Sequence, residues 1–205
     1  MGRKKPEVLK KTKPIFYIFC GGLKTEVNYF KLQLQKKGLS TNGVIGKGID
    51  PKRLLEIAKE KYESKANIDQ VWIVIDKDNF EIEDFNSTIN NCNNNDIGCS
   101  WSNPCFELWF WLHVKDVNGK FNTKSCIEKF SKDFQSTFGI EYSKTNLKCI
   151  ELLNSPENRE LAINRAKKLV DIMQSSKDYN KNNYSEHNPY TTVYKLVENI
   201  LNNSL

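Results

Sequence analysis

The stretch Val-Trp-Ile-Val-Ile-Asp-Lys-Asp occupies residues 71–78. Its first five residues are apolar, mostly β-branched and too few for a helix, which is typical of a buried strand in an α/β sheet. Asp76 and Asp78 follow this strand directly. If the strand continues through them, their side chains share one face and lie about 7 Å apart. The stretch therefore predicts an inner strand that ends in two carboxylates.

The position of this aspartate pair suggests a ligand site. Open α/β sheets bind ligands at the carboxyl ends of their strands, and hard carboxylate oxygens suit Mg²⁺ or Mn²⁺. The alternative is that Asp76 and Asp78 only cap a helix that starts near Phe80, because aspartate favours such positions. These residues alone leave both interpretations open.

Strands and helices alternate on both sides of this stretch. A strand is expected at residues 15–20, followed by Gly21-Gly22 and by a helix from Thr25 to about Gln35. A short strand is expected at 43–48, and a helix from Pro51 carries the apolar stripe Leu54, Leu55, Ala58 and Tyr62. A further helix is expected at 81–91 and a further strand at 97–101. This alternation predicts an α/β fold with a mostly parallel sheet flanked by helices.

The second half of the chain predicts a helical extension. Helices are expected at residues 104–114, 123–137, 157–174 and 190–202. The last two carry amphipathic stripes, formed by Leu161, Ala162, Ala166, Leu169, Val170 and Met173, and by Val193, Tyr194, Leu196, Val197, Ile200 and Leu201. Residues 175–189 are polar and without periodicity, so we expect a mobile loop placed over the site.

Length predicts one compact domain with three segments. A chain of 205 residues is long enough for a single well-buried core. We expect a basic leader at 1–14, an α/β core at 15–115 and the helical extension at 116–205, packed on that core. The leader and a net charge of +6 favour a polyanionic partner such as nucleic acid, although the leader could equally be a solvated terminus.

Composition also predicts where the protein acts. No apolar stretch approaches the roughly 20 residues of a membrane span, and no signal-peptide pattern opens the chain. Six cysteines without a C-x-x-C pair, beside only two histidines, predict reduced thiols rather than zinc ligands or disulfides. We therefore expect a soluble cytoplasmic protein without membrane contact.

The turn after the first predicted strand is a second candidate for chemistry. Its sequence, Gly-Gly-Leu-Lys-Thr-Glu at residues 21–26, opens a helix whose free N–H groups suit anions. The turn lacks the glycines of a phosphate-binding P-loop, which argues against an NTPase. It brings Lys24 and Glu26 to the sheet edge of Asp76 and Asp78, an arrangement that suits metal-assisted phosphoryl chemistry. The alternative for Glu26 is an ordinary acidic residue in a first helical turn.

Glu107 is the third acidic candidate. It lies in the otherwise apolar helix predicted at 104–114, where a buried charge needs a partner, so we expect it to face a cation or the site. His113 in the same helix is interpreted as a helix-end histidine rather than a ligand. Trp109 and Trp111 are expected to be exposed and could serve an interface, including that of a homodimer.

Four blocks of the sequence together resemble the RloB-like proteins of bacterial abortive infection. The blocks are residues 20–30, 75–80, 102–109 and 188–193, and they occur in the family's order over nearly the whole chain. Such proteins resemble Toprim nucleases and are often encoded beside an ATPase called RloA. The resemblance implies a Toprim-like sheet with a helical part, Mg²⁺-dependent cleavage of DNA or RNA, and an RloA-like ATPase as partner.

The resemblance also implies roles for individual residues. Asp76 and Asp78 match the metal-binding D-x-D of Toprim domains, and Glu26 matches the second acid of the turn after the first strand. The first acid of that turn falls on Gly21, which is a departure from the pattern. Either Glu26 and Glu107 take over its work, or the protein binds metal and nucleic acid without efficient cleavage.

Three functions follow as expectations. The first is a metal-dependent nuclease of phage defence that acts on a nucleic acid, for example an RNA such as tRNA. In it, Lys24 neutralises the scissile phosphate and Glu107 adds a ligand. The second is a binding module for nucleic acid or for the ATPase that has lost turnover. The third, a haloacid-dehalogenase-type phosphatase, is disfavoured because Phe80 stands where that motif needs a small or β-branched residue. His187, Thr191 and Thr192 belong either to the site or to the cap of the last helix, and the cap is favoured.

Overall fold

A five-stranded, mostly parallel sheet forms the centre of the molecule. The computed structural model describes residues 13–64, 68–78 and 80–203. Its strands are β1 (Phe16–Cys20), β2 (Val44–Gly46), β3 (Gln70–Asp76), β4 (Gly98–Asn103) and β5 (Tyr190–Thr191), in the order β2-β1-β3-β4-β5. Only β5 runs antiparallel to its neighbour, β4. The expectation of an α/β fold with a mostly parallel sheet is confirmed.

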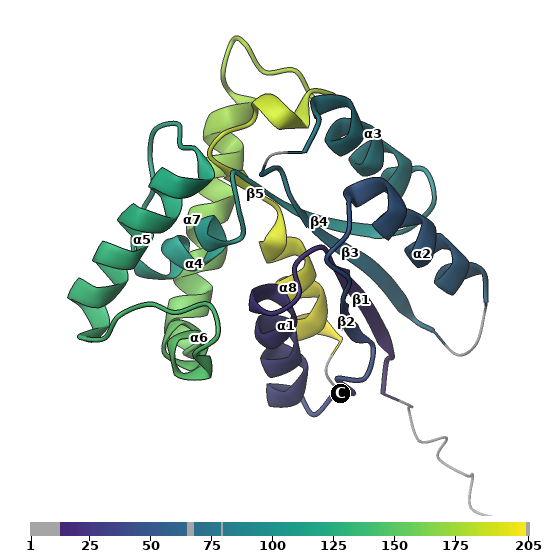
Figure 1. The fold of residues 1–205 in the computed structure, drawn as a ribbon, viewed down its shortest axis with the longest axis horizontal. Coiled ribbons are helices and arrows are strands. Elements are labelled where there is room, and N and C mark those ends of the chain that lie inside the picture. The colour runs from purple at the N-terminus through teal and green to yellow at the C-terminus, as the bar shows by residue number, and fades with distance from the viewer. Residues whose placement is uncertain (1–12, 65–67, 79, 204–205) are drawn as a thin grey trace, which may run out of the picture.

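Helices cover both faces of this sheet (Figure 1). On one face, α1 (Thr25–Lys36) contacts β1 and β2, and α8 (Val193–Asn202) contacts β4. On the other face, α2 (Pro51–Glu63) contacts β1 and β3, and α3 (Ile82–Asn93) contacts β4. Apolar residues on both sides of β3 pack under these helices, which explains its continuous hydrophobic run.

The helical part is built around α4 (Glu107–Val114), which is buried along almost its whole length. It packs against α5 (Thr123–Phe138) and α7 (Pro156–Gln174), with contacts also to α6 (Leu147–Leu153), and Figure 1 shows this group beside the sheet. Aromatic rings fill the contact: Phe110 lies 5.2 Å from Phe106 and 6.2 Å from Phe130 between ring centroids. A short 3₁₀ turn, η1 (Tyr184–Glu186), lies against α3 in the segment expected to be a loop.

Several expectations about individual elements are wrong. Residues 190–191 form β5 rather than the start of the last helix, because Thr191 pairs with Ser102 at the end of β4. Helix α6 was not expected. Tyr62 and Leu161 are exposed at 45% each, although both were assigned to apolar stripes. Tyr62 lies in the last turn of α2, and Leu161 precedes Ala162, the first buried residue of α7.

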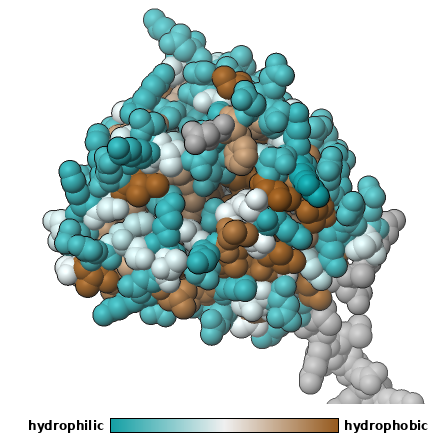
Figure 2. Space-filling view, in the orientation of Figure 1, coloured by the Kyte–Doolittle hydropathy of each residue, from teal (hydrophilic) through white to brown (hydrophobic). Residues whose placement is uncertain are grey.

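Trp109 and Trp111 are buried, at 0% and 5% exposure, so they cannot serve as exposed interface residues. Trp111 donates a hydrogen bond from Nε1 to Asp133 Oδ2 (2.7 Å), and Trp109 packs within the aromatic core. The face in Figure 2 is mostly hydrophilic, with apolar residues in small separate groups. Large exposed apolar side chains such as Leu23, Ile82 and Ile172 come from different elements.

All six cysteines are free thiols, and all except Cys99 are buried. This confirms the expectation of unpaired cysteines. No helix in the described part of the chain has both the length and the apolar character needed to cross a membrane. Most of the basic leader, residues 1–12, lies outside the described residues.

Candidate functional site

A cavity of about 460 Å³ opens at the carboxyl ends of β1 and β3. The strand order places β2 and β3 on opposite sides of β1, so the chain changes direction here, and ligands of open α/β sheets bind at such points. The structure brings all five predicted site residues together in the lining of this cavity: Lys24, Glu26, Asp76, Asp78 and Glu107. Further lining comes from the Gly21-Gly22 turn, Phe106, Lys144 and Thr145.

Asp76 ends β3 and carries the most perturbed carboxyl of the cavity. Burial raises the pKa of its carboxyl well above the usual range, and the nearby Glu26, Glu107 and Asp78 carboxylates raise it further. Its buried Oδ1 atom has no hydrogen-bond partner within the described part of the chain. A buried carboxylate oxygen without a partner is strongly disfavoured, so this atom is suited to receive a proton or a cation.

Glu26 lies in the first turn of α1 and is only 7% exposed. Its carboxylate folds back onto the preceding turn so closely that a Cβ atom on Gly22 would lie 2.2 Å from Glu26 Oε2. Burial raises the pKa of Glu26, backbone hydrogen bonds from Glu26 and Gly22 oppose this, and the Glu107 carboxylate adds to the increase. Glycine at position 22 is therefore what allows this carboxylate to sit over the backbone.

Glu107 begins α4 and is 2% exposed. Lys144 Nζ lies 2.8 Å from Glu107 Oε1, and the Tyr142 hydroxyl donates a hydrogen bond to the same oxygen (3.3 Å). Burial alone lowers the pKa of Lys144, but the charge of Glu107 and the hydrogen bond to it outweigh this effect and raise the pKa. Glu107 thus faces a cation, as one of the two expectations held, and it lines the cavity.

Lys144 and Tyr142 were missed because they lie in the irregular link between α5 and α6. Nothing in the periodicity or local motifs of this link points to the site. Its approach to Glu107 depends on how α5 packs against α4, which no local pattern encodes.

Asp78 reaches the cavity in a different way from Asp76. The strand ends at Asp76, and Asp78 has a left-handed backbone with φ of 36°, so the two side chains do not share one strand face as expected. The turn is held by bonds from Lys77 N to Ser102 O (2.8 Å) and from Asp78 N to Pro104 O (3.0 Å). Asp78 Oδ1 accepts a hydrogen bond from Thr123 Oγ1 at 2.6 Å. The capping alternative also fails, because the residue at the N-cap of α3 is Glu81.

The donor atoms of the cavity suit a hard divalent cation. Glu26, Asp76, Asp78 and Glu107 supply carboxylate oxygens, and Asp76 Oδ1 lacks any partner in the described structure. Within residues 13–64, 68–78 and 80–203, no three acidic, histidine or cysteine side chains are close enough to hold one ion together. Mg²⁺ usually keeps several waters and needs only one or two protein carboxylates, so the residues present fit this ion.

Comparison with known families identifies the chain. A model of the family described as RloB-like protein matches residues 16–200. The chain belongs to the RloB-like protein family. The matched range contains every residue of the cavity in this RloB-like protein. Searches of the curated proteins and of the solved structures found no match.

Gly21 stands where the resemblance to Toprim domains leads one to expect the first acid of the turn in this RloB-like protein. Its N–H donates a hydrogen bond to Val74 O (2.8 Å), and a Cβ atom built there would lie 3.5 Å from the same oxygen, an ordinary contact. Gly21 is not among the residues with positive φ. The backbone therefore accepts a Cβ atom at this position.

The remaining polar candidates of this RloB-like protein lie outside the carboxylate cavity. Thr191 Oγ1 lies 3.0 Å from Ser102 Oγ, and Thr192 Oγ1 accepts from Trp101 N at 2.9 Å, so both threonines join β5 and α8 to β4. His113 is buried among aromatic rings, and burial lowers its pKa to about 3. His187 is also buried, and its Nε2 lies 3.0 Å from Asn180 O. These contacts are structural.

Proposed function

We propose that this RloB-like protein is a metal-dependent nuclease. The observation that carries the proposal is the convergence of the buried Glu26 and Glu107 and the half-buried Asp76 at one cavity on the carboxyl edge of β1 and β3. Buried carboxylates with raised pKa values destabilise a fold, so their clustering in a cleft favours a functional role. Oxygen donors of this kind bind Mg²⁺ or Mn²⁺, and such ions support phosphodiester hydrolysis.

Each residue has a role in this proposal. Asp76 and Asp78 hold Mg²⁺ or Mn²⁺, which when bound would polarise the phosphate and activate water. Glu26, held over Gly22, assists the metal or accepts a proton, and Glu107 adds a further oxygen. Lys24, exposed at the N-terminal end of α1, offsets the charge of the scissile phosphate. Lys144 neutralises Glu107 while no metal is bound.

The biological setting follows from the family resemblance. We propose that the protein acts in the cytoplasm in abortive infection against phage, together with an RloA-like ATPase. Its substrate in this proposal is DNA or an RNA such as tRNA. Its net charge of +6 supports a polyanionic substrate.

The test is cleavage of a panel of tRNA, plasmid and single-stranded substrates with Mg²⁺, Mn²⁺ or chelator, with and without the ATPase. The wild-type chain is expected to cleave at least one substrate only when metal is present, and Asp76→Ala should abolish this cleavage. Asp69→Ala is a matched control, because Asp69 precedes β3 at its opposite end, where its carboxylate accepts a hydrogen bond from Ile15 N. Cleavage that survives Asp76→Ala would refute the nuclease.

A second candidate is a Toprim-like binding module that has lost efficient catalysis. Two observations favour it: Gly21 supplies no carboxylate, and the described residues contain no preformed three-ligand metal cluster. The test is Gly21→Glu, whose Cβ atom the local backbone accommodates. If the module is correct, wild-type cleavage should be weak or undetectable, and Gly21→Glu should raise it in the presence of Mg²⁺. A fully active wild type, unaffected or impaired by Gly21→Glu, would exclude the module.

A further inference from the structure

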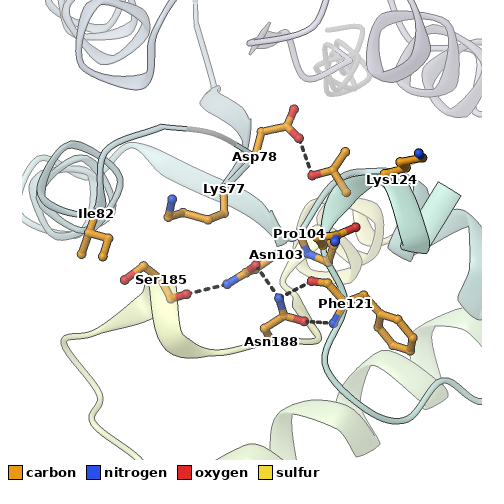
Figure 3. A pocket seen from close by; sticks show the side chains of 11 residues that line it. Lys77, Asp78, Ile82, Asn103, Pro104, Phe121, Lys124, Ser185 and Asn188 are labelled. Atoms are coloured by element: carbon orange, nitrogen blue, oxygen red, sulfur yellow. Dashed lines mark hydrogen bonds between the residues drawn. The ribbon is translucent and has the colours of Figure 1, made fainter.

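A second, larger cavity of about 680 Å³ adjoins the carboxylate cavity, and Asp78 lines both. Figure 3 shows its lining, with Lys77 and Lys124 on either side of Asp78. Lys77 Nζ donates a hydrogen bond to Phe80 O, which holds it at the wall. The Lys124 side chain is exposed, and its Nζ lies 4.0 Å from Glu128 Oε1. The shared aspartate means that a ligand here would be next to whatever occupies the carboxylate cavity.

The floor of this second cavity is held in place by two asparagines (Figure 3). Asn188 Nδ2 donates to Asn103 Oδ1 (3.2 Å) and to Phe121 O (2.7 Å), and Asn188 Oδ1 accepts from Phe121 N (3.0 Å). Asn103 Nδ2 donates to Ser185 O (2.8 Å). These bonds tie three distant segments of the chain together. The cavity is therefore preformed, as small-molecule sites usually are.

The chemistry of the lining matches that of one nucleotide. Lys77 and Lys124 supply ammonium groups for a phosphate, and Ile82, Pro104 and Phe121 supply apolar surface for a base. The volume lies within the roughly 300–1,000 Å³ of typical ligand pockets. A base that is paired and stacked in a duplex cannot enter such a cavity without being extruded, and this unstacking costs free energy.

Resting on the proposed function, we propose that this cavity binds an unpaired nucleotide adjoining the phosphodiester at the carboxylate site. The substrate is then a single strand, or a loop or end with an unpaired base beside the cleaved bond. Lys124 contacts a phosphate of this nucleotide, and Ile82 packs against its base.

Fluorescence anisotropy with labelled oligonucleotides tests this assignment. The wild-type chain is titrated in chelator with single-stranded RNA, single-stranded DNA and blunt duplexes of the same sequences, over a range of salt concentrations. Single strands should bind at least about 10-fold more tightly than duplexes, because the duplex must unstack a base. The single strand that binds more tightly, RNA or DNA, identifies the sugar of the substrate.

Two variants test the proposed contacts of Lys124 and Ile82 with the nucleotide. Lys124→Ala should reduce the slope of log affinity against log salt by about 0.7, as expected for one lost single-strand phosphate contact. Ile82→Trp should fill the cavity and weaken single-strand binding only, and since Ile82 is 51% exposed the fold should tolerate it. Lys59→Ala is the control, because this lysine of α2 lies in neither cavity.

Equal binding of single strands and duplexes, or unchanged binding in both variants, would overturn the proposal that this cavity binds a nucleotide. Because binding is measured without metal, cleavage plays no part in the result. Asp76-dependent cleavage of a duplex alongside such a result would still support the proposed nuclease activity. The expected binding without any metal-dependent cleavage would support nucleotide binding in the cavity and refute the proposed nuclease activity.

Discussion

At the scale of single residues, the site concentrates negative charge where water is largely excluded. Glu107 has Lys144 as a partner, whereas Asp76 Oδ1 has none in the described structure. Burial of a carboxylate destabilises a fold unless a proton or a cation compensates its charge. Proteins commonly retain such destabilising groups where function needs them.

Asp76→Asn should therefore stabilise the protein at neutral pH. The folded-state pKa of Asp76 is raised above its unfolded value of about 3.9. This group favours folding below the unfolded pKa, and the benefit is lost as the pH rises through the folded pKa. The variant lacks this penalty, so its melting temperature should exceed that of wild type by about 2 °C or more at neutral pH. The difference should shrink in acid.

Thermal unfolding followed by circular dichroism in metal-free buffer at several pH values measures this effect. Asp78→Asn is the matched control, because Asp78 is exposed and should show no comparable gain. A lower melting temperature for Asp76→Asn at neutral pH would show that its carboxylate is not a destabilising group.

Gly22→Ala tests the placement of Glu26. The new methyl group would lie 2.2 Å from Glu26 Oε2 and must displace the carboxylate. Displacement of a reacting group by about 1 Å can reduce a rate by roughly 100-fold, so metal-dependent cleavage should fall steeply. Gly21→Ala is the control, since its methyl group meets only Val74 O at 3.5 Å. Equal initial rates for the two variants would contradict the role of Glu26.

At the scale of elements, the helical part completes a site that begins on the sheet. The start of α1 and the end of β3 supply Glu26 and Asp76, whereas α5 and the link after it supply Thr123, Tyr142 and Lys144. The site thus depends on the docking of α5 beside the sheet, through α4.

Thr123→Val should test this dependence. The change removes the hydroxyl that donates to Asp78 Oδ1 at 2.6 Å. Loss of an outer hydrogen bond to a metal ligand typically weakens metal affinity by about 10–100-fold, and Thr123→Ser should restore it. Thr137→Val is the control on the same helix, because its hydroxyl donates only to Asp133 O. Metal titration of the variants measures the effect, and equal affinities would place Asp78 outside the metal site.

At the scale of the whole molecule, regular elements could be predicted and their packing could not. The run at 71–75 and the alternation around it indicated the sheet because buried parallel strands are apolar on both faces. The five predicted cavity residues could also be identified from the sequence, because they lie at the ends of strands or the starts of helices on one sheet edge.

The remaining features depend on contacts distant in sequence. Strand β5 has only two residues and no periodic pattern, so this segment was assigned to the last helix and its pairing with β4 was missed. The positive φ of Asp78 arises in a turn held by Ser102 and Pro104. Lys144 reaches Glu107 only through the packing of α5 and α4, which local sequence does not encode.

The central claim is that the buried carboxylates form a metal site, and calorimetric titration with Mn²⁺ tests it most directly. The wild-type chain and Asp76→Asn are titrated in two buffers of different ionisation enthalpy. The account predicts that wild type binds Mn²⁺ and releases protons, because burial raises the pKa values of Asp76 and Glu26 and a bound metal requires their deprotonated forms. Asp76→Asn should lose this binding. Absence of Mn²⁺ binding to wild type, or equal binding to both chains, would contradict the account.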